Sequence, residues 1–214
     1  MVLMAVFVAM AYAVQLVFRI KVFGFLTFDA KDAILTLGAM VLGPVSGIVM
    51  AVLVALIEMI SVSETAFWGF LMNAVSSSVF VALASSIYRR KKSLNTALLG
   101  LAASILATTA VMLLMNIWVT PIYSGMPTMD IVRMIPTVLL PFNLTKAVFN
   151  AALVMVLYKP VTMALRRIHV VSGSADYHMN RVSVLVLVGG LVVIAGCVVA
   201  FLLGMNGHFI FGSK

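Results

Sequence analysis

The chain has 214 residues, of which 64% are apolar and only 9% are charged, and its mean hydropathy is +1.22. This composition is typical of an integral membrane protein and excludes a soluble domain. The formal net charge of +8 could suggest nucleic-acid binding, but most of the basic residues lie in predicted loops, where membrane topology explains them. We therefore expect a lipid bilayer around the chain and no nucleic-acid partner.

The first predicted transmembrane helix covers residues 2–18. We expect it to be retained, because neither a basic stretch nor a clear small-residue cleavage site accompanies it. Ala5, Ala9 and Ala13 recur at every fourth position, a spacing that lets another helix approach closely. They indicate either a docking surface for a partner subunit or packing inside the same bundle.

The loop at residues 19–31 (RIKVFGFLTFDAK) mixes charged and aromatic side chains. It is too apolar for a hydrated linker, so we expect it to fold back over another part of the protein. Asp29 and Asp32 bracket the start of the next helix, where carboxylates favour the helix dipole.

The apolar run at residues 32–60 is interrupted by Gly43-Pro44. As one helix it would be roughly 44 Å long, well over the ~30 Å hydrocarbon core of a bilayer. Glycine followed by proline ends one helix and begins the next. The run therefore predicts a tight hairpin of two helices, the first of them unusually short.

Four further helices are predicted at residues 67–88, 94–118, 135–159 and 182–203, joined by loops at 61–66 and 119–134 and a polar linker at 168–180. The basic run Arg89-Arg90-Lys91-Lys92 is cytoplasmic by the positive-inside rule, and so is the Arg166-Arg167 pair two crossings later. The amino terminus is then cytoplasmic, and the loops at 19–31, 61–66 and 119–134 are external. The last helix has almost no polar side chains and is expected to face lipid.

The helix at residues 135–159 carries Asn143, Lys146 and Asn150 within an arc of roughly 60°, so the three share one face. A lysine in a membrane span marks a functional site by default. The alternative is a lysine that snorkels to the lipid headgroups. Two asparagines on the same face favour the functional interpretation, because a snorkelling lysine does not need them.

Three other polar residues, Glu58, Asn73 and Asn116, fall in the external halves of their helices. Together with Asn143 and Lys146 they predict an outward-facing pocket that the aromatic loop covers. The alternative is chance clustering of polar groups near helix ends, where such residues are common.

The sequence lacks the motifs of several enzyme classes. It contains no G-x-x-x-x-G-K-[ST], H-E-x-x-H or G-x-S-x-G, so any ATP-driven work requires a partner. Cys197 is the only cysteine, which excludes an intrachain disulfide or a cysteine-based metal cluster. His169, His178 and His208 lie in or beside polar tail segments, and we predict no catalytic residue, no metal site and no cofactor.

Three segments, FLTFDAKDAILTLGAMVLGP (25–44), NIWVTPIY (116–123) and LLPFNLTKAVFNAALVMVLYKP (139–160), resemble the substrate-binding S components of energy-coupling factor (ECF) vitamin transporters, in particular the riboflavin-specific ones. The resemblance covers residues 1–167 and implies an all-α membrane protein, a six-helix bundle with a pocket open to the outside of a bacterial cell. It also implies a transmembrane scaffold subunit and two ATPase subunits as partners, so that only the partners use ATP. The linker at 168–180 and the seventh, C-terminal transmembrane helix within 181–214 depart from the six helices of the family.

The resemblance also implies roles for particular residues. Asn143 and Lys146 would contact the flavin ring system, Asn116 would contact the ligand from the preceding helix, and Ala5, Ala9 and Ala13 would dock against the scaffold subunit. The complete predicted binding set is Phe25, Leu26, Thr27, Phe28, Glu58, Asn73, Asn116, Asn143, Lys146 and Asn150. Of these, Glu58 and Asn73 come from the topology argument and not from the resemblance.

The ligand itself stays open at this point. Riboflavin is uncharged, with a flat ring and a polyol tail, and suits an apolar slot that holds a few amide and ammonium groups. An anionic vitamin such as pantothenate would instead use Lys146 as a charge partner, whereas a Glu58–Lys146 pair would favour the neutral ligand. Another class is an intramembrane enzyme with Glu58 and Lys146 as acid and base, against which the spans hold only one carboxylate and no histidine or metal set. A further class is a structural subunit without a ligand.

Overall fold

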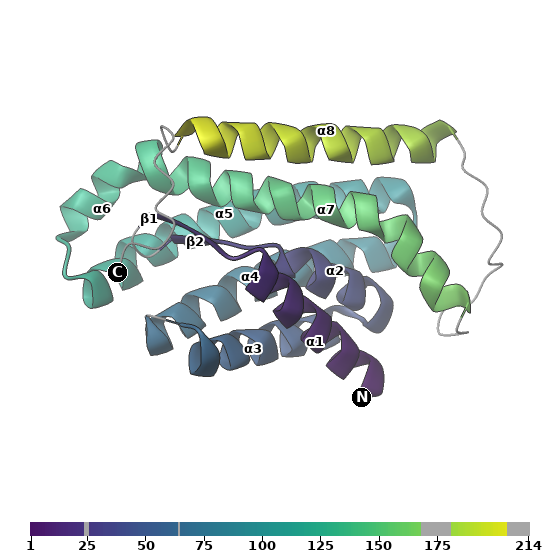
Figure 1. Ribbon diagram of the computed structural model, residues 1–214, viewed down its shortest axis with the longest axis horizontal. Helices are drawn as coiled ribbons and strands as arrows, with labels where there is room; N and C mark the ends of the chain where they lie inside the picture. Colours follow the sequence, from purple (N-terminus) through teal and green to yellow (C-terminus); the bar gives the residue numbers. More distant parts are fainter. Residues whose placement is uncertain (24–25, 64, 168–180, 205–214) are drawn as a thin grey trace.

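The protein is described by a computed structural model that covers residues 1–23, 26–63, 65–167 and 181–204 (Figure 1). The elements in chain order are α1 (Val2–Val17), β1 (Ile20–Phe23), β2 (Leu26–Phe28), α2 (Lys31–Leu42), α3 (Pro44–Ser61), α4 (Ala66–Arg90), α5 (Leu94–Ser124), α6 (Thr128–Met134), the π-helix η1 (Ile135–Leu139), α7 (Leu140–Arg167) and α8 (Arg181–Gly204). Phe25, the linker at 168–180 and the three histidines lie outside the described residues.

Among the described residues, four helical stretches are long and apolar enough to cross a bilayer: α3, α4, α5 and the continuous stretch Thr128–Ala164 that includes η1 and most of α7. Shorter apolar stretches lie in α1 and at Val184–Val199 of α8. The predicted all-α membrane bundle with an additional C-terminal helix is therefore confirmed.

The break at Gly43-Pro44 separates α2 from α3, as the sequence predicts. Gly43 adopts φ +112° and ψ 163°, a backbone conformation that favours glycine, and the Arg89 guanidinium lies over its Cα. Pro44 then occupies the first turn of α3, where its missing N–H leaves no hydrogen bond unmade. With 12 residues, α2 is only about 18 Å long.

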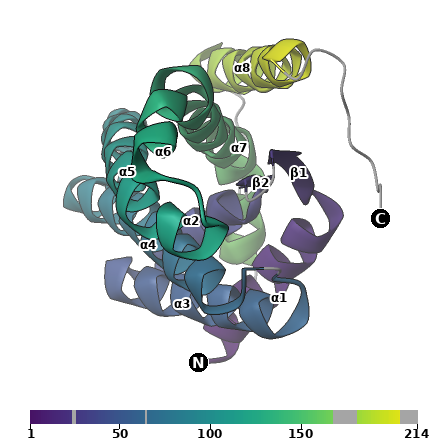
Figure 2. The same cartoon turned by 90° about the vertical axis from the view of Figure 1, so that its left-hand side faces the viewer.

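Helix α2 lies at the centre of the bundle (Figure 2). Every residue from Lys31 to Met40 is buried, and α1, α3, α4 and α7 all pack against this helix. Its apolar side chains join Phe7, Met50 and Phe80 in the main hydrophobic core. The short helix therefore begins in the interior of the bundle, and its first charged residues are enclosed by the longer helices.

The loop at residues 19–31 folds back, as expected, but it does so as an antiparallel β-hairpin in which Ile20 pairs with Phe28 and Lys21 with Thr27. Phe28 packs on the rings of Phe142 and Phe149, with ring centroids 6.5 Å and 4.9 Å away. The hairpin is thereby fixed to α7.

Two predicted boundaries are wrong. The segment at 119–134 is mostly helical and not a loop, because α5 continues through Pro121 and ends at Gly125, whose left-handed φ of +70° stops the helix. Helix α7 likewise continues through Pro160 to Arg167. A proline removes one backbone hydrogen bond, and membrane helices tolerate that loss when neighbouring groups compensate.

Helix α8 lies on the outside of the bundle along α7 (Figures 1 and 2). Gly190 lets the two helices approach closely, since a Cβ atom there would lie 2.8 Å from Val156. Many other side chains of α8, such as Leu185 and Val192, are exposed.

Candidate functional site

A polar cavity of about 70 Å³ lies at the end of the bundle where α2 begins, between the β-hairpin, α3, α4, α5 and α7. It is lined by Arg19, Leu26, Thr27, Glu58, Ser63, Thr65, Gly69, Met72, Asn73, Ser76, Met112, Asn116, Tyr123, Phe142, Asn143 and Lys146. The structure therefore brings together most of the predicted binding set. Phe28 and Asn150 lie outside this lining, and Phe25 is not among the described residues.

Lys146 is directed into the bundle and forms an ion pair. Its Nζ lies 2.9 Å from Oδ2 of Asp29 and donates a hydrogen bond to the Thr27 carbonyl oxygen at 3.3 Å. The lysine is largely buried, so the snorkelling alternative is wrong. Asp29 itself lies between β2 and α2, and its buried carboxylate has both Lys146 and Lys31 beside it, with Nζ atoms 2.9 Å and 3.7 Å from its Oδ2.

Glu58 does not pair with Lys146, the arrangement considered above as favouring a neutral ligand, because Lys31 takes that place. Lys31 is fully buried at the start of α2, and its Nζ lies 2.8 Å from Oε2 of Glu58 and 3.7 Å from Oδ2 of Asp29. The same Oε2 accepts a hydrogen bond of 2.9 Å from the amide of Asn73. Two lysines and two carboxylates thus form a continuous network whose formal charges cancel.

Sequence reasoning missed Lys31 and assigned Asp29 only a helix-dipole role. The sequence feature that could have indicated this network is the run of alternating charges Asp29-Ala30-Lys31-Asp32 at the start of a short helix. A helix of that length is too short to place these charged groups at the membrane surface. Asp32 lies in the first turn of α2, as its dipole role requires, and also accepts a 2.5 Å hydrogen bond from the Ser77 hydroxyl.

Asn150 supports the start of α2. Its Oδ1 accepts the backbone N–H of Ala33 at 3.0 Å, and its Nδ2 donates to the Asp29 carbonyl oxygen at 3.0 Å. A helix start leaves several N–H groups without partners inside the helix, and this amide satisfies one of them from 117 residues away. In this structure Asn150 positions Asp29 and α2 and does not line the cavity.

Asn116 and Asn143 present their amides beside the cavity from α5 and α7. In each, Nδ2 donates to the carbonyl oxygen four residues earlier, that of Met112 at 2.7 Å and that of Leu139 at 2.8 Å. The carbonyl side of Asn116 also accepts a hydrogen bond from Thr120 at 3.0 Å. Both side chains are therefore held in place by their own helices.

The cavity is narrow in this structure. Nη1 of Arg19, just before β1, donates a 2.7 Å hydrogen bond to the carbonyl oxygen of Val62 in the connection between α3 and α4. A volume of about 70 Å³ holds roughly two water molecules, whereas small-molecule pockets measure about 300–1,000 Å³. A ligand of vitamin size therefore requires the hairpin and the facing helices to move apart.

Ala5, Ala9 and Ala13 are exposed on the outer face of α1, next to the exposed Val6 and Met10. Because these alanines are exposed, they do not take part in packing inside the bundle, which was the alternative explanation for their spacing. Their docking to a scaffold subunit stays a prediction.

A family model described as ECF transporter, substrate-specific component, matches residues 1–158. The riboflavin transporter RibU of Staphylococcus aureus (strain TCH60) is 26% identical over 151 residues, which cover 67% of this chain and 79% of that protein. A solved structure described as the S component of a bacterial ECF transporter superposes with a TM-score of 0.66 at 23% identity, over 78% of this chain and 96% of that one, and shows the same fold. The chain therefore belongs to the family of substrate-specific components of ECF transporters.

Proposed function

We propose that this protein binds riboflavin in the polar cavity and passes it to an ATP-driven energy-coupling module in the bacterial cell membrane. The observation that carries the proposal is the pairing of the lysines at the cavity. Lys146 is paired with Asp29, and Lys31 with Glu58, so neither lysine offers an unpaired charge to a ligand, and Arg19 in the lining donates to the Val62 carbonyl oxygen. The similarity to a riboflavin transporter supports the same ligand.

An anionic vitamin such as pantothenate fits this arrangement less well. To use Lys146 as its charge partner, such a ligand would have to displace Asp29, which would leave a buried carboxylate without its closest cation. An uncharged flavin requires only hydrogen bonds, and Lys146, Asn116 and Asn143 supply donors and acceptors beside the apolar side chains of Leu26 and Phe142.

Intramembrane enzyme activity is the weaker proposal. An acid and a base that act together must reach the same substrate atoms, but Glu58 and Lys146 each form an ion pair with a different partner. Membership in a transporter family also favours binding without catalysis.

We place the amino terminus on the cytoplasmic side, because Arg89, Arg90, Lys91 and Lys92 are exposed at the end of the bundle opposite the cavity. The cavity then faces outward. The scaffold subunit would dock on the exposed alanine face of α1, and two ATPases would use the ATP.

The test is the visible absorption spectrum of the detergent-purified protein, followed by titration of riboflavin fluorescence with the protein. We expect flavin absorption and quenching at stoichiometric ratios. Lys146→Ala should weaken binding at least tenfold, because a hydrogen bond to a charged group contributes about 1.5–3 kcal/mol. Arg90→Ala, at the opposite end, should leave binding unchanged. A colourless protein that leaves riboflavin fluorescence unaltered would refute riboflavin as the ligand, and calorimetric titration with pantothenate would then test the anionic alternative.

A further inference from the structure

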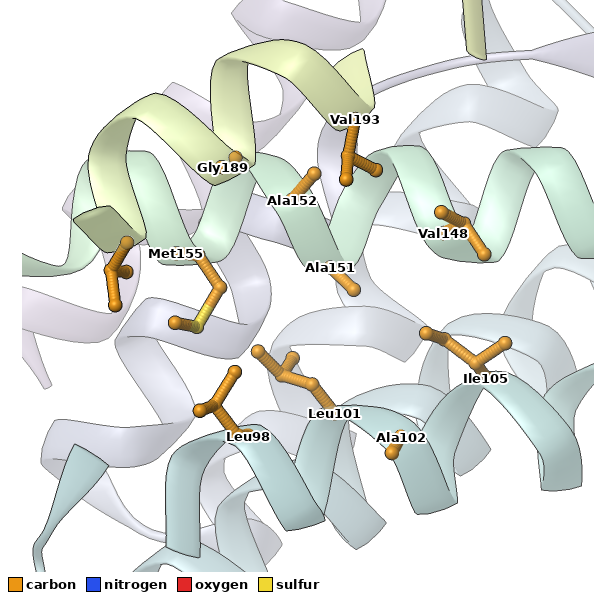
Figure 3. Close-up of a pocket in the computed structure, with 12 residues that line it drawn as sticks. Leu98, Leu101, Ala102, Ile105, Val148, Ala151, Ala152, Met155, Gly189 and Val193 are labelled. Carbon is orange, nitrogen blue, oxygen red and sulfur yellow. The ribbon is translucent and has the colours of Figure 1, made fainter. Parts of the chain in front are cut away.

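An apolar groove of about 350 Å³ lies between α5, α7 and α8, on a different side of the protein from the polar cavity (Figure 3). Figure 3 shows Leu101 and Ile105 of α5 facing Ala151 and Met155 of α7 across the groove, with Gly189 of α8 above α7 in this view. All the side chains that line it are apolar, and Leu98 at its rim is 45% exposed. A groove of this kind offers water no hydrogen bonds and is open to what surrounds the helices.

The position of the groove along the helices restricts what can fill it. Leu98 lies about 6 Å from Leu94, where α5 begins, and Ile105 lies about 10 Å further along. The groove is thus within roughly one half of the ~30 Å hydrocarbon core, on the side of the basic end. At this depth the surrounding solvent consists of lipid acyl chains.

The nearest end of the bundle is strongly basic. Arg89, Arg90, Lys91 and Lys92 are exposed immediately before α5. The acidic residues that the structure describes, Asp29, Asp32, Glu58 and Asp130, belong to segments at the opposite end of the bundle. A negatively charged headgroup above the groove would therefore meet several cations and none of these carboxylates.

We propose that the groove binds one acyl chain of an anionic phospholipid from the leaflet at the basic end, and that the phosphate headgroup of this lipid lies against Lys91 and Lys92. Helix α8 makes the site possible. It supplies the third wall, with Gly190 in close contact with α7 and Gly189 leaving the space beside it open. The helix that departs from the six-helix family would thus bind a lipid against the bundle.

Native mass spectrometry of the full-length protein in detergent can test the chain-binding part. The probes are phosphatidylglycerol and phosphatidylcholine with identical acyl chains. Gly189→Leu should reduce bound phosphatidylglycerol at least tenfold, because its side chain would occupy the groove. Gly196→Leu is the matched control: it lies on the same helix, has no atom within 4 Å of its Cβ position and does not line the groove. Equal lipid retention by the two variants would overturn the proposal.

The headgroup part is tested with the Lys91→Gln/Lys92→Gln double variant. Each lysine near an anionic headgroup is expected to contribute about fivefold to the preference for phosphatidylglycerol over phosphatidylcholine. The double variant should lose most of that preference, whereas Arg133→Gln, 77% exposed at the other end, should keep it. A wild-type protein that binds both lipids equally would refute the anionic headgroup. Thermal melts by circular dichroism confirm that each variant is folded.

Discussion

Replacing Lys31 with methionine is expected to lower the free energy of unfolding by about 3–5 kcal/mol, because it removes one partner of a buried ion pair. Lys31 is 1% exposed, and its Nζ lies 2.8 Å from Glu58 and 3.7 Å from Asp29. Methionine fills much of the same volume without the charge, so the loss is mainly electrostatic. For a protein of this size the change corresponds to a melting temperature roughly 6–20 °C lower.

The double variant Lys31→Met/Glu58→Gln separates this mechanism from simple loss of packing. Glutamine keeps the acceptor for the Asn73 amide but removes the carboxylate that Lys31→Met leaves unpaired. Asp29 retains Lys146. We therefore expect the double variant to be more stable than Lys31→Met alone and to regain at least half of the loss.

The measurement is thermal unfolding of the detergent-purified protein, followed by intrinsic fluorescence. Arg133→Met serves as the control, because its pair with Asp130 is 3.8 Å long and both side chains are mostly exposed. Such surface pairs contribute about 0–1 kcal/mol. If the destabilisation by Glu58→Gln simply adds to that of Lys31→Met, the two residues are not coupled and the reasoning fails.

Two further predictions concern single positions. Asn143→Ala should weaken riboflavin binding about tenfold with a small change in melting temperature, whereas Asn150→Ala should mainly lower stability, since it leaves the Ala33 N–H unsatisfied. Fluorescence titration measures the binding of each variant and thermal melts measure its stability. The reverse pattern would contradict the assigned roles. Gly43→Ala should cost about 1–3 kcal/mol, because alanine is strained at φ +112°, whereas the exposed Arg89 side chain can move away from the new methyl group. An unchanged melting temperature would show that this turn relaxes freely.

The sequence was sufficient to predict the bundle and the general position of the site. Apolar segments of membrane-spanning length predict helices, Gly43-Pro44 predicts the break, and helical periodicity places Asn143 and Lys146 on one inward face. These features depend on local geometry, which the order of residues determines directly.

Partner choice inside the site could not be predicted in the same way. Lys146 and Asp29 are 117 residues apart, and their pairing depends on how closely the start of α2 approaches α7. Helical periodicity places Asn150 on the same face as Lys146. It does not predict that the Asn150 amide forms hydrogen bonds with the backbone of Ala33 and Asp29. Pro121 and Pro160 are local stop signals that tertiary contacts override.

The length of α2 also determines how far a bound ligand must travel. Its 12 residues raise the start of the helix, and the cavity beside it, about 18 Å above the basic end of the bundle. If the cavity faces outward, as we propose, a ligand in it has already passed about 12 Å of a ~30 Å hydrocarbon core. Release on the cytoplasmic side would then require the protein to expose the ligand across the length of one short helix, and not across a full membrane thickness.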